Sequence, residues 1–208
     1  MRNDLGLEKD LLLKQYRFGT EQALARANFL DTNEIVTLQA FVLFLACIRR
    51  YDETRFVWSL IALAIRIAQS LGLHRDGSKF GLSPFDTEMR RRLWWQVCIL
   101  DIRAAEDHGS EPAIVEHLFD TNVPLNIDDC DLNPEATEAP IPKVGLTEMT
   151  FCLIRFEIST LMRRLNHFTP GKYCGPRMGQ HLTVEEKEGM IKEFSDGLEE
   201  KYLKYCLE

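Results

Sequence analysis

Apolar residues recur every three or four positions through most of the chain, a period typical of α-helices that bury one face. Short polar or glycine-containing stretches separate the periodic segments. These segments cover residues 8–27, 33–50, 54–72, 84–107, 147–168 and 184–206. No segment has the alternating pattern of a β-strand, and the sequence contains no internal repeat. The sequence therefore predicts an all-α fold, a bundle of several helices.

The segment 33–50 is apolar on nearly every side, which predicts a helix buried at the centre of the molecule. Asp31 and Glu34 have the spacing of a capping box at its start. Only a few residues separate this segment from 54–72, so we expect the two helices to pack as an antiparallel hairpin. Gly72 is expected to end the second helix, because glycine readily adopts the left-handed conformation that stops a helix.

Two later helix starts are marked by capping side chains. Ser83 supplies a hydroxyl acceptor, and Pro84 follows at the first helical position, where its missing N–H costs nothing. Asp86 then places a negative charge in the first turn. Thr183 and Glu186 have the spacing of a second capping box. These signals predict helices that begin near residues 84 and 184.

The stretch 108–146 differs from the rest of the chain, since it holds five of the eight prolines and a cluster of acids. It predicts a long Pro/Asp-rich connection with, at most, a short helix near residues 112–118. A structureless loop of this length is unusual in a compact domain. We therefore expect its apolar side chains to hold it across the helices. These side chains are Phe119, Val123, Leu125, Ile127 and Leu132.

The 208 residues suit one domain, 1–208. The chain carries 25 Lys and Arg against 32 Asp and Glu, a formal charge of −7, which repels a phosphate backbone. We therefore expect no direct nucleic-acid contact by these residues. The longest nearly apolar run, 35–48, is too short and too polar to cross a bilayer, and the acidic start lacks a secretory signal. These features predict a soluble, intracellular protein without membrane contact.

The six cysteines do not have the spacing of a metal site. None lies closer than 22 residues to the next, whereas structural zinc sites use short CxxC-like pairs. We expect these thiols to be reduced and buried, as small hydrophobic side chains. The six are Cys47, Cys98, Cys130, Cys152, Cys174 and Cys206. The sequence thus predicts no metal site and no cofactor in this chain.

One triplet, His74-Arg75-Asp76, copies the start of a kinase catalytic loop. A kinase needs an asparagine five residues after that aspartate, where this chain has Gly81, and it needs a glycine-rich phosphate loop. We therefore interpret the triplet as a helix C-terminus, where cations suit the exposed carbonyls. No nucleophile and base are paired by spacing elsewhere, so the sequence predicts no catalytic residue and no enzyme.

The only basic run, Arg90-Arg91-Arg92, is interpreted as a solvated helix face. Asp86 and Glu88 each precede one of its arginines by four residues, the spacing of helical ion pairs. Two tryptophans follow the run. We expect Trp94 in the core and Trp95 as a half-buried shoulder, given the area that each ring can bury.

Asp101 lies on or beside an apolar helix face, where a carboxylate needs a cation or hydrogen-bond donors. Arg66 is similarly surrounded by apolar residues in the neighbouring helix. We therefore expect Arg66 and Asp101 to form an ion pair across the interface between the two helices.

Four segments resemble those of the fungal zinc-cluster transcription factors. Residues 58–76 are similar to the family's "W…AiR.A..LGLHRD" pattern, and residues 90–101 to "RRRLWW…D". Residues 109–112 and 124–132 resemble the "G.P" and "lP.NiDD.DL" elements. The order and spacing also agree. The residues that carry the resemblance are Trp58, Arg66, Gly72, His74, Arg75, Asp76, Arg91, Arg92, Leu93, Trp94, Trp95, Asp101, Gly109, Pro112, Pro124, Asp128 and Asp131.

The resemblance implies the middle homology, or regulatory, domain of that family. Such a domain is all-helical and follows a DNA-binding binuclear zinc cluster. It implies a role in the nucleus, transcription by RNA polymerase II, dimeric action and regulation by a metabolite or a partner. The zinc cluster needs six closely spaced cysteines in a basic segment, which this chain does not contain. We expect a fragment, a truncated gene product or a stand-alone paralogue, without the C-terminal helices of the family's region.

Two functions remain open. The first is a regulatory module that contacts a protein partner or a second copy and takes a small-molecule effector, with Phe194, Leu198 and Tyr202 as an exposed seam on the last helix. The alternative is a stand-alone helical small-molecule-binding protein or enzyme that reuses the fold, for example in a secondary-metabolite gene cluster. Its pocket would lie between helices 54–72 and 84–107. The candidate residues are Arg66, Trp94, Asp101, Glu106 and His108.

Overall fold

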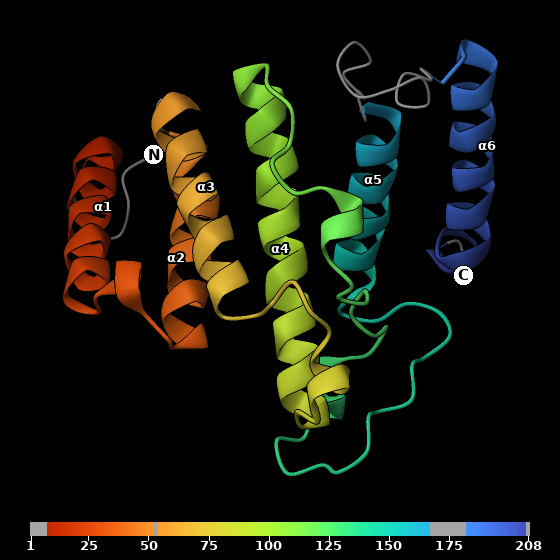
Figure 1. Ribbon diagram of the computed structural model, residues 1–208, viewed down its shortest axis with the longest axis horizontal. Helices are drawn as coiled ribbons and strands as arrows, with labels where there is room; N and C mark the ends of the chain where they lie inside the picture. The colour runs from red at the N-terminus through yellow and green to blue at the C-terminus, as the bar shows by residue number, and fades with distance from the viewer. Residues whose placement is uncertain (1–7, 52–53, 167–181, 207–208) are drawn as a thin grey trace.

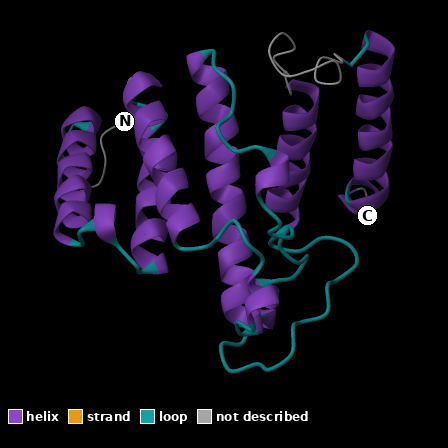
Figure 2. Cartoon of the chain, viewed as in Figure 1, coloured by secondary structure: helices purple, strands orange, loops and turns teal. Residues whose placement is uncertain are grey.

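The computed structural model describes residues 8–51, 54–166 and 182–206. In this part of the chain every regular element is helical, which confirms the all-α prediction (Figure 2). Short 3-10 turns join some of the helices. The six α-helices are α1 (Lys9–Arg26), α2 (Ile35–Ile48), α3 (Thr54–Ser70), α4 (Pro84–His108), α5 (Thr150–Asn166) and α6 (Val184–Lys201).

The helices stand in a row from α1 to α6, with α2 and α3 paired in the antiparallel hairpin that the sequence predicts (Figure 1). The longest helix, α4, stands in the middle and packs against α2, α3 and α5. α4 and α5 run in the same direction (Figure 1). A 25-residue helix is about 37 Å long, so the chain must travel back that distance before α5 can begin. This geometry explains why the connection between α4 and α5 is long.

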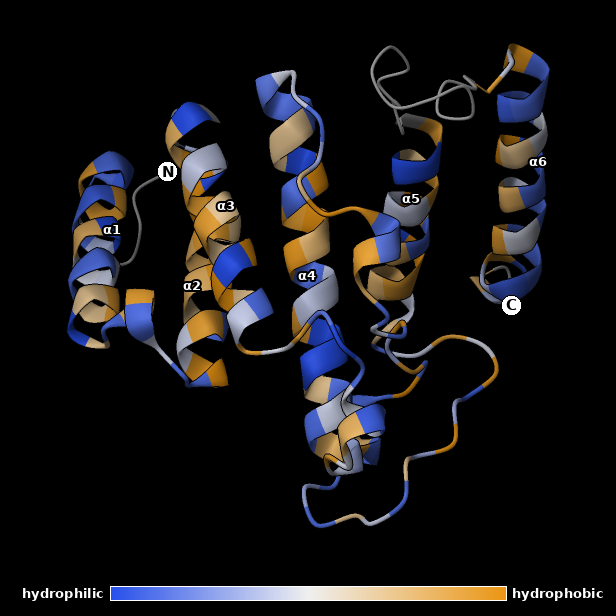
Figure 3. Cartoon of the chain, in the orientation of Figure 1, coloured by the Kyte–Doolittle hydropathy of each residue, from blue (hydrophilic) through white to orange (hydrophobic). Residues whose placement is uncertain are grey.

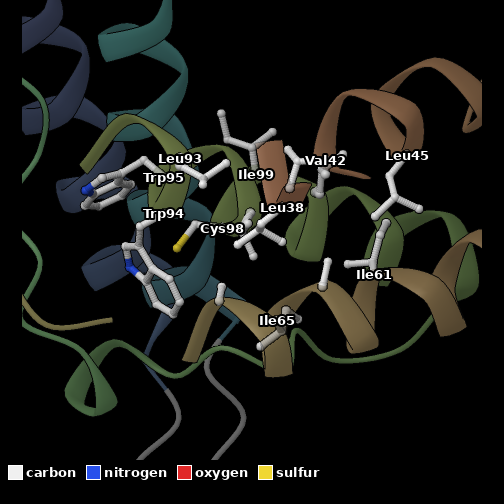
Figure 4. Packing of buried hydrophobic residues seen from close by; sticks show 14 of the residues in the cluster. Leu38, Val42, Leu45, Ile61, Ile65, Leu93, Trp94, Trp95, Cys98 and Ile99 are labelled. Carbon is white, nitrogen blue, oxygen red and sulfur yellow. The ribbon is translucent and has the colours of Figure 1, made fainter. Parts of the chain in front are cut away.

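The core lies between α2, α3, α4 and α5. Trp94 and Cys98 of α4 are fully buried, and Leu38 of α2 lies beside Cys98 (Figure 4). The prediction for Trp94 is confirmed. Trp95 is also buried, rather than half-buried, because it packs on the α5 side against Phe156.

The central buried helix is α4 and not the segment 33–50. α2 is the most apolar helix in Figure 3, and its inner face is buried. Its outer face, however, leaves Val36 71% and Leu43 66% exposed. The expectation of a helix buried on all sides is therefore wrong, because α2 lies near the end of the row and α1 covers only part of its outer face.

Most of the predicted helix ends are confirmed. Ser83 Oγ accepts from the backbone N–H of Asp86 at 3.0 Å, and Gly72 takes the left-handed conformation with φ +75°. Thr183 and Glu186 make the predicted capping box at the start of α6. The capping box at Asp31 and Glu34 is wrong: Asp31 ends a 3-10 turn, and the Glu34 N–H donates to Thr32 Oγ1 instead. The final residues of the predicted segment 147–168 lie outside the described residues.

The connection after α4 lies along the helices and carries only 3-10 turns, Glu116–Leu118 and Asp129–Asp131. Ile127 is fully buried, and Phe119 packs its ring edge-on against Trp94 and Trp95. Leu125 and Leu132 are half-buried, whereas Val123 is exposed. The prediction that apolar side chains hold the connection in place is thus confirmed except at Val123.

Several cysteines are less buried than the sequence predicts. Cys98 is buried and Cys152 half-buried, but Cys47, Cys130 and Cys206 are exposed. Cys47 is exposed because it lies on the outer side of α2, and Cys174 lies outside the described residues. In the part of the chain that the structure describes, no three potential metal ligands come together and no helix is long and apolar enough to span a bilayer.

The seam predicted on the last helix is not an exposed surface. Tyr202 is buried, and its hydroxyl donates to Glu157 of α5 at 2.9 Å. Phe194 and Leu198 are half-buried. The apolar side of α6 faces inward because α5 is the neighbour against which it packs.

Candidate functional site

Part of the family-like segments meets around the turn between α3 and α4, against residues 112–125, which we call the strap. Asp76 lies after α3 and is 0% exposed. Its two carboxylate oxygens accept from Arg91 Nε and Nη2, each at 2.8 Å. They also accept from the N–H and hydroxyl of Ser78 and from the Asn122 N–H in the strap, the last at 2.9 Å.

This arrangement fixes the charge on Asp76. Burial by itself would raise the pKa of the carboxyl, but the hydrogen bonds from Arg91, Ser78 and Asn122 outweigh it and hold the pKa well below its ordinary value. The same bond to Asp76 raises the pKa of Arg91 despite its burial. The pair is therefore fully ionised, and every acceptor position on Asp76 is occupied by the protein itself. Asp76 has no free oxygen with which to act as a base or a ligand.

A second carboxylate, Glu88 of α4, repeats this pattern. It is buried and accepts from Arg92 Nε at 3.0 Å, which confirms the predicted i,i+4 pair. Its oxygens also accept from the Leu125 N–H in the strap at 3.2 and 3.3 Å. Arg92 in turn donates to Asp129 at 2.6 Å, beyond the strap.

A third carboxylate, Asp101, is buried farther along α4. It accepts from the backbone N–H groups of Ala113 at 3.0 Å and Ile114 at 2.8 Å, and its burial raises its pKa. The predicted ion pair with Arg66 is wrong. Arg66 lies on the exposed side of α3 and donates to Gln69 at 3.4 Å, while Asp101 faces the strap. The donors that the carboxylate needs come from the backbone and not from a cation.

We call Asp76, Glu88 and Asp101 the clasp, since all three bind backbone N–H groups of the strap. Further bonds run beside the clasp: Trp95 Nε1 donates to the Asn122 carbonyl at 2.9 Å, and Thr121 Oγ1 to the Leu73 carbonyl at 2.6 Å. The clasp holds the strap to α4 at both of its ends. Its role is structural, because each of its carboxylate oxygens already accepts a hydrogen bond from the protein.

The basic run on α4 is not a solvated face. The side chains of Arg91 and Arg92 are only 13% and 17% exposed. Arg90 donates to the Leu71 carbonyl at 2.9 Å rather than to Asp86, which instead accepts from the Ser83 hydroxyl. The expectation fails here because spacing along one helix does not reveal the strap and the α3–α4 turn that cover this face.

The triplet His74-Arg75-Asp76 is more than a helix end. Asp76 starts a 3-10 turn and belongs to the clasp, while Arg75 donates to the half-buried Asp120 at 3.4 Å. His74 lies beside Trp94, with ring centroids 6.2 Å apart, and its buried Nδ1 has no hydrogen-bond partner among the described residues. Burial and the nearby Arg75 charge lower the pKa of His74. The neutral ring thus fits this apolar position.

The remaining residues of the resemblance support the same scaffold. Trp58 stacks on His108 at 4.7 Å, and Gly109 ends α4 with φ +69°. Asp128 and Asp131 both pair with Lys143, at 2.8 and 2.6 Å. Leu93 and Pro124 are buried, and Pro112 is half-buried beside the strap's first bonds.

The pocket expected between α3 and α4 is not present as a binding site. In the described structure the hollow at that interface, beside Trp58 and Asp107, measures about 20 Å³, enough for about one water molecule. The candidate residues do not converge there, since Trp94 and Asp101 are buried and Glu106 pairs with Arg103 at 2.8 Å. A hollow of this size at the α3–α4 interface has no room for a ligand.

A larger hollow, which the sequence did not suggest, lies between the strap, α5 and α6. We call it the crevice. It consists of two adjoining hollows of about 820 and 550 Å³. Both are lined by Glu116, Arg163, Arg164 and Met190. One signal could have indicated it: Met149, Phe156 and Arg163 follow at seven-residue intervals, so an arginine occupies a position of the buried stripe of α5.

Comparison with known proteins assigns the chain to a family. The family model described as the fungal specific transcription factor domain matches residues 4–200. No solved structure matches the chain.

Three curated relatives are transcription factors by name. The pyriculol/pyriculariol biosynthesis cluster transcription factor 1 of Pyricularia oryzae is 35% identical, over 97% of this chain and 28% of its own. The C6 finger domain transcription factor hasF of Aspergillus fumigatus is 40% identical, over 96% and 28%. The aurofusarin cluster transcription factor aurR2 of Gibberella zeae is 41% identical, over 77% and 24%. The chain thus spans about a quarter of the length of these relatives, and it belongs to the fungal specific transcription factor domain family.

Proposed function

We propose that this chain is a regulatory module of transcription in the nucleus of a fungus and that it carries out no reaction of its own. The observation that carries the proposal is the family match over nearly the whole chain, together with relatives that are named as transcription factors of biosynthetic gene clusters. The clasp supports it, since its three buried carboxylates are occupied by the protein's own donors. The genes under control would be those of a secondary-metabolite cluster.

The module acts through protein contacts and an effector rather than through DNA. A formal charge of −7 is unfavourable for binding a phosphate backbone. The wide spacing of the cysteines does not fit the zinc cluster of the family, so no zinc or other cofactor is assigned to these residues. A protein partner or a second copy of the chain, and a small-molecule effector, are the ligands that this function requires.

The test is to fuse the whole chain to an unrelated DNA-binding domain and to measure a reporter gene that carries the matching operator in yeast. We expect the fusion to change reporter expression relative to the DNA-binding domain alone. The clasp variant Asp76→Asn should reduce the effect, whereas Glu106→Gln, on an exposed ion pair, should keep it. A stably expressed, nuclear fusion that leaves the reporter unchanged would contradict the proposal.

The alternative of a stand-alone enzyme is not favoured by any observation on the clasp or the hairpin interface. The crevice does favour the binding of a small molecule, which suits a regulatory module equally well. A purified chain that turns over a substrate would exclude the regulatory proposal in its present form.

A further inference from the structure

The crevice contains one charged group whose environment differs from that of every other cation on its walls. Arg163 of α5 lines both halves of the crevice and is only 7% exposed. Its neighbour Arg164 is exposed and forms a two-pronged pair with Glu116, with the shortest contact at 2.7 Å. Lys201 pairs with Glu157 at 3.3 Å. Both of these cations therefore have a carboxylate from the protein.

None of the described carboxylates is hydrogen-bonded to Arg163. Its hydrogen bond runs from Nη2 to the neutral carbonyl of Cys98 at 2.8 Å, and its buried Nε has no partner. The ring of Phe119 lies 6.0 Å from the guanidinium carbon. The nearest acid in the core is Asp101, but both of its oxygens already accept from backbone N–H groups of the strap. Asp101 therefore acts on Arg163 only through space.

A buried guanidinium with an unused donor is costly unless an anion completes it. Arginine presents its N–H groups in a planar fork that matches a carboxylate. Three acids on the crevice wall already have partners: Glu116 pairs with Arg164, Glu157 with Lys201 and the Tyr202 hydroxyl, and Asp120 with Arg75 and Lys79. Glu193 of α6 and Glu111 also line the crevice, but both are exposed. Among the described residues no carboxylate completes the Arg163 guanidinium, which favours a carboxylate from outside the chain as its partner.

The walls around Arg163 indicate the rest of the ligand. Aromatic and aliphatic side chains from the strap, α4, α5 and α6 line the same hollow as Arg163. They are Trp95, Phe119, Leu161, Met190 and Phe194. Each half of the crevice is within the range of about 300–1,000 Å³ that small-molecule sites occupy. Such walls suit a flat apolar body attached to the carboxylate.

We propose that the crevice is a binding site for a small aromatic carboxylic acid, with its carboxylate on Arg163 and its ring against Trp95 and Phe119. The site gives the proposed regulatory module a chemical class of effector. The effect of the bound acid on transcription rests on the proposed regulatory function. The binding itself is argued from the geometry of the crevice alone.

The probe is cinnamate, compared with the uncharged cinnamamide of nearly the same shape. Binding of both to the whole purified chain is measured by titration calorimetry. We expect cinnamate to bind about ten times more tightly than cinnamamide, as a charge-assisted pair of hydrogen bonds requires. In nitrogen-15 spectra, the Arg163 Nε–H signal should shift with cinnamate and not with the amide. Equal affinities, or an unmoved Nε–H signal, would overturn the proposal.

Variants of Arg163 test whether this residue binds the carboxylate. Arg163→Met should bind the acid and the amide equally, whereas Arg155→Met, on the same helix but outside the crevice, should keep the tenfold preference. If Arg163→Met does not fold, Arg163→Lys retains the charge without the fork and should reduce the preference. If the variants at position 163 keep the full preference for cinnamate over cinnamamide, the proposed site is wrong. The reporter assay is independent, since a fusion that regulates transcription without binding cinnamate would refute this site and leave the regulatory function standing.

Discussion

At the scale of single residues, the structure uses buried carboxylates to organise the backbone. Asp76 binds Arg91 and a strap N–H at the same time, so it joins the α3–α4 turn, the central helix and the strap. The sequence revealed Asp101 as a carboxylate that needs donors but assigned them to Arg66. The error has a physical origin: backbone N–H groups from a connection of irregular structure leave no periodic signal in a sequence.

The first prediction concerns the charge pair of the clasp. Asp76→Asn should lower the free energy of unfolding by about 3–5 kcal/mol, because it leaves Arg91 buried without its anion. Urea unfolding followed by circular dichroism measures the loss. The control is Glu106→Gln, which removes an exposed pair with Arg103 and should cost less than about 1 kcal/mol. Equal losses in the two variants would contradict the central role of Asp76.

The second prediction is the pH dependence of this pair. The pKa of Asp76 is lower in the folded chain than in the unfolded chain, so the unfolded state takes up protons first as the solution is acidified. The stabilisation is complete above the unfolded value of about 4 and is lost progressively below it. The difference in unfolding free energy between wild type and Asp76→Asn should therefore narrow from pH 6 towards about pH 3. If the difference in unfolding free energy between the two proteins does not change with pH, ionised Asp76 does not stabilise the fold as proposed.

At the scale of elements, the helices and most of their ends could be predicted, because period, caps and glycines act within a few residues of each other. Ser83 and Thr183 are examples. What could not be predicted is which helix is central. α2 is more apolar than α4, yet α4 is the buried one, because it packs on both sides and the strap covers its charged face. Burial of an element depends on its neighbours as well as on its own composition.

The third prediction tests this point within one helix. Leu45→Ala should cost about 2–5 kcal/mol, since Leu45 of α2 is fully buried in the core. Leu43→Ala, two residues away on the exposed side, should change the unfolding free energy by less than about 0.5 kcal/mol. The measurement is again urea unfolding of the two variants. A loss at Leu43 as large as that at Leu45 would mean that the outer face of α2 is covered in solution.

At the scale of the whole molecule, the helices form a row in which the central helix packs against more neighbours than the helices at the ends. α4 packs against three other helices, whereas α1 packs chiefly on α2 and α6 chiefly on α5. The sequence could not predict this order, and it could not predict the crevice, whose walls come from segments far apart in the chain. Only the position of Arg163 on the buried stripe of α5 hinted at it.

The fourth prediction follows from the row. Segments with few buried contacts open at lower free energy than the centre of a fold. Amide hydrogens of α1 and α6 should therefore exchange with deuterium faster than those of α4, as measured by mass spectrometry of peptides from the native chain. Uniform protection across the three helices would show that the row unfolds only as a unit.

The bonds that the clasp makes have a consequence for which mutations the strap can tolerate. The clasp carboxylates accept hydrogen bonds from the peptide N–H groups of Ala113 and Asn122, and both residues are otherwise exposed. Nearly any amino acid offers the same N–H, but proline does not. In a saturation library of the strap, almost every substitution at these two positions should therefore be tolerated and only proline should not. The amino-acid sequence of the strap could then diverge while its attachment to the clasp is kept.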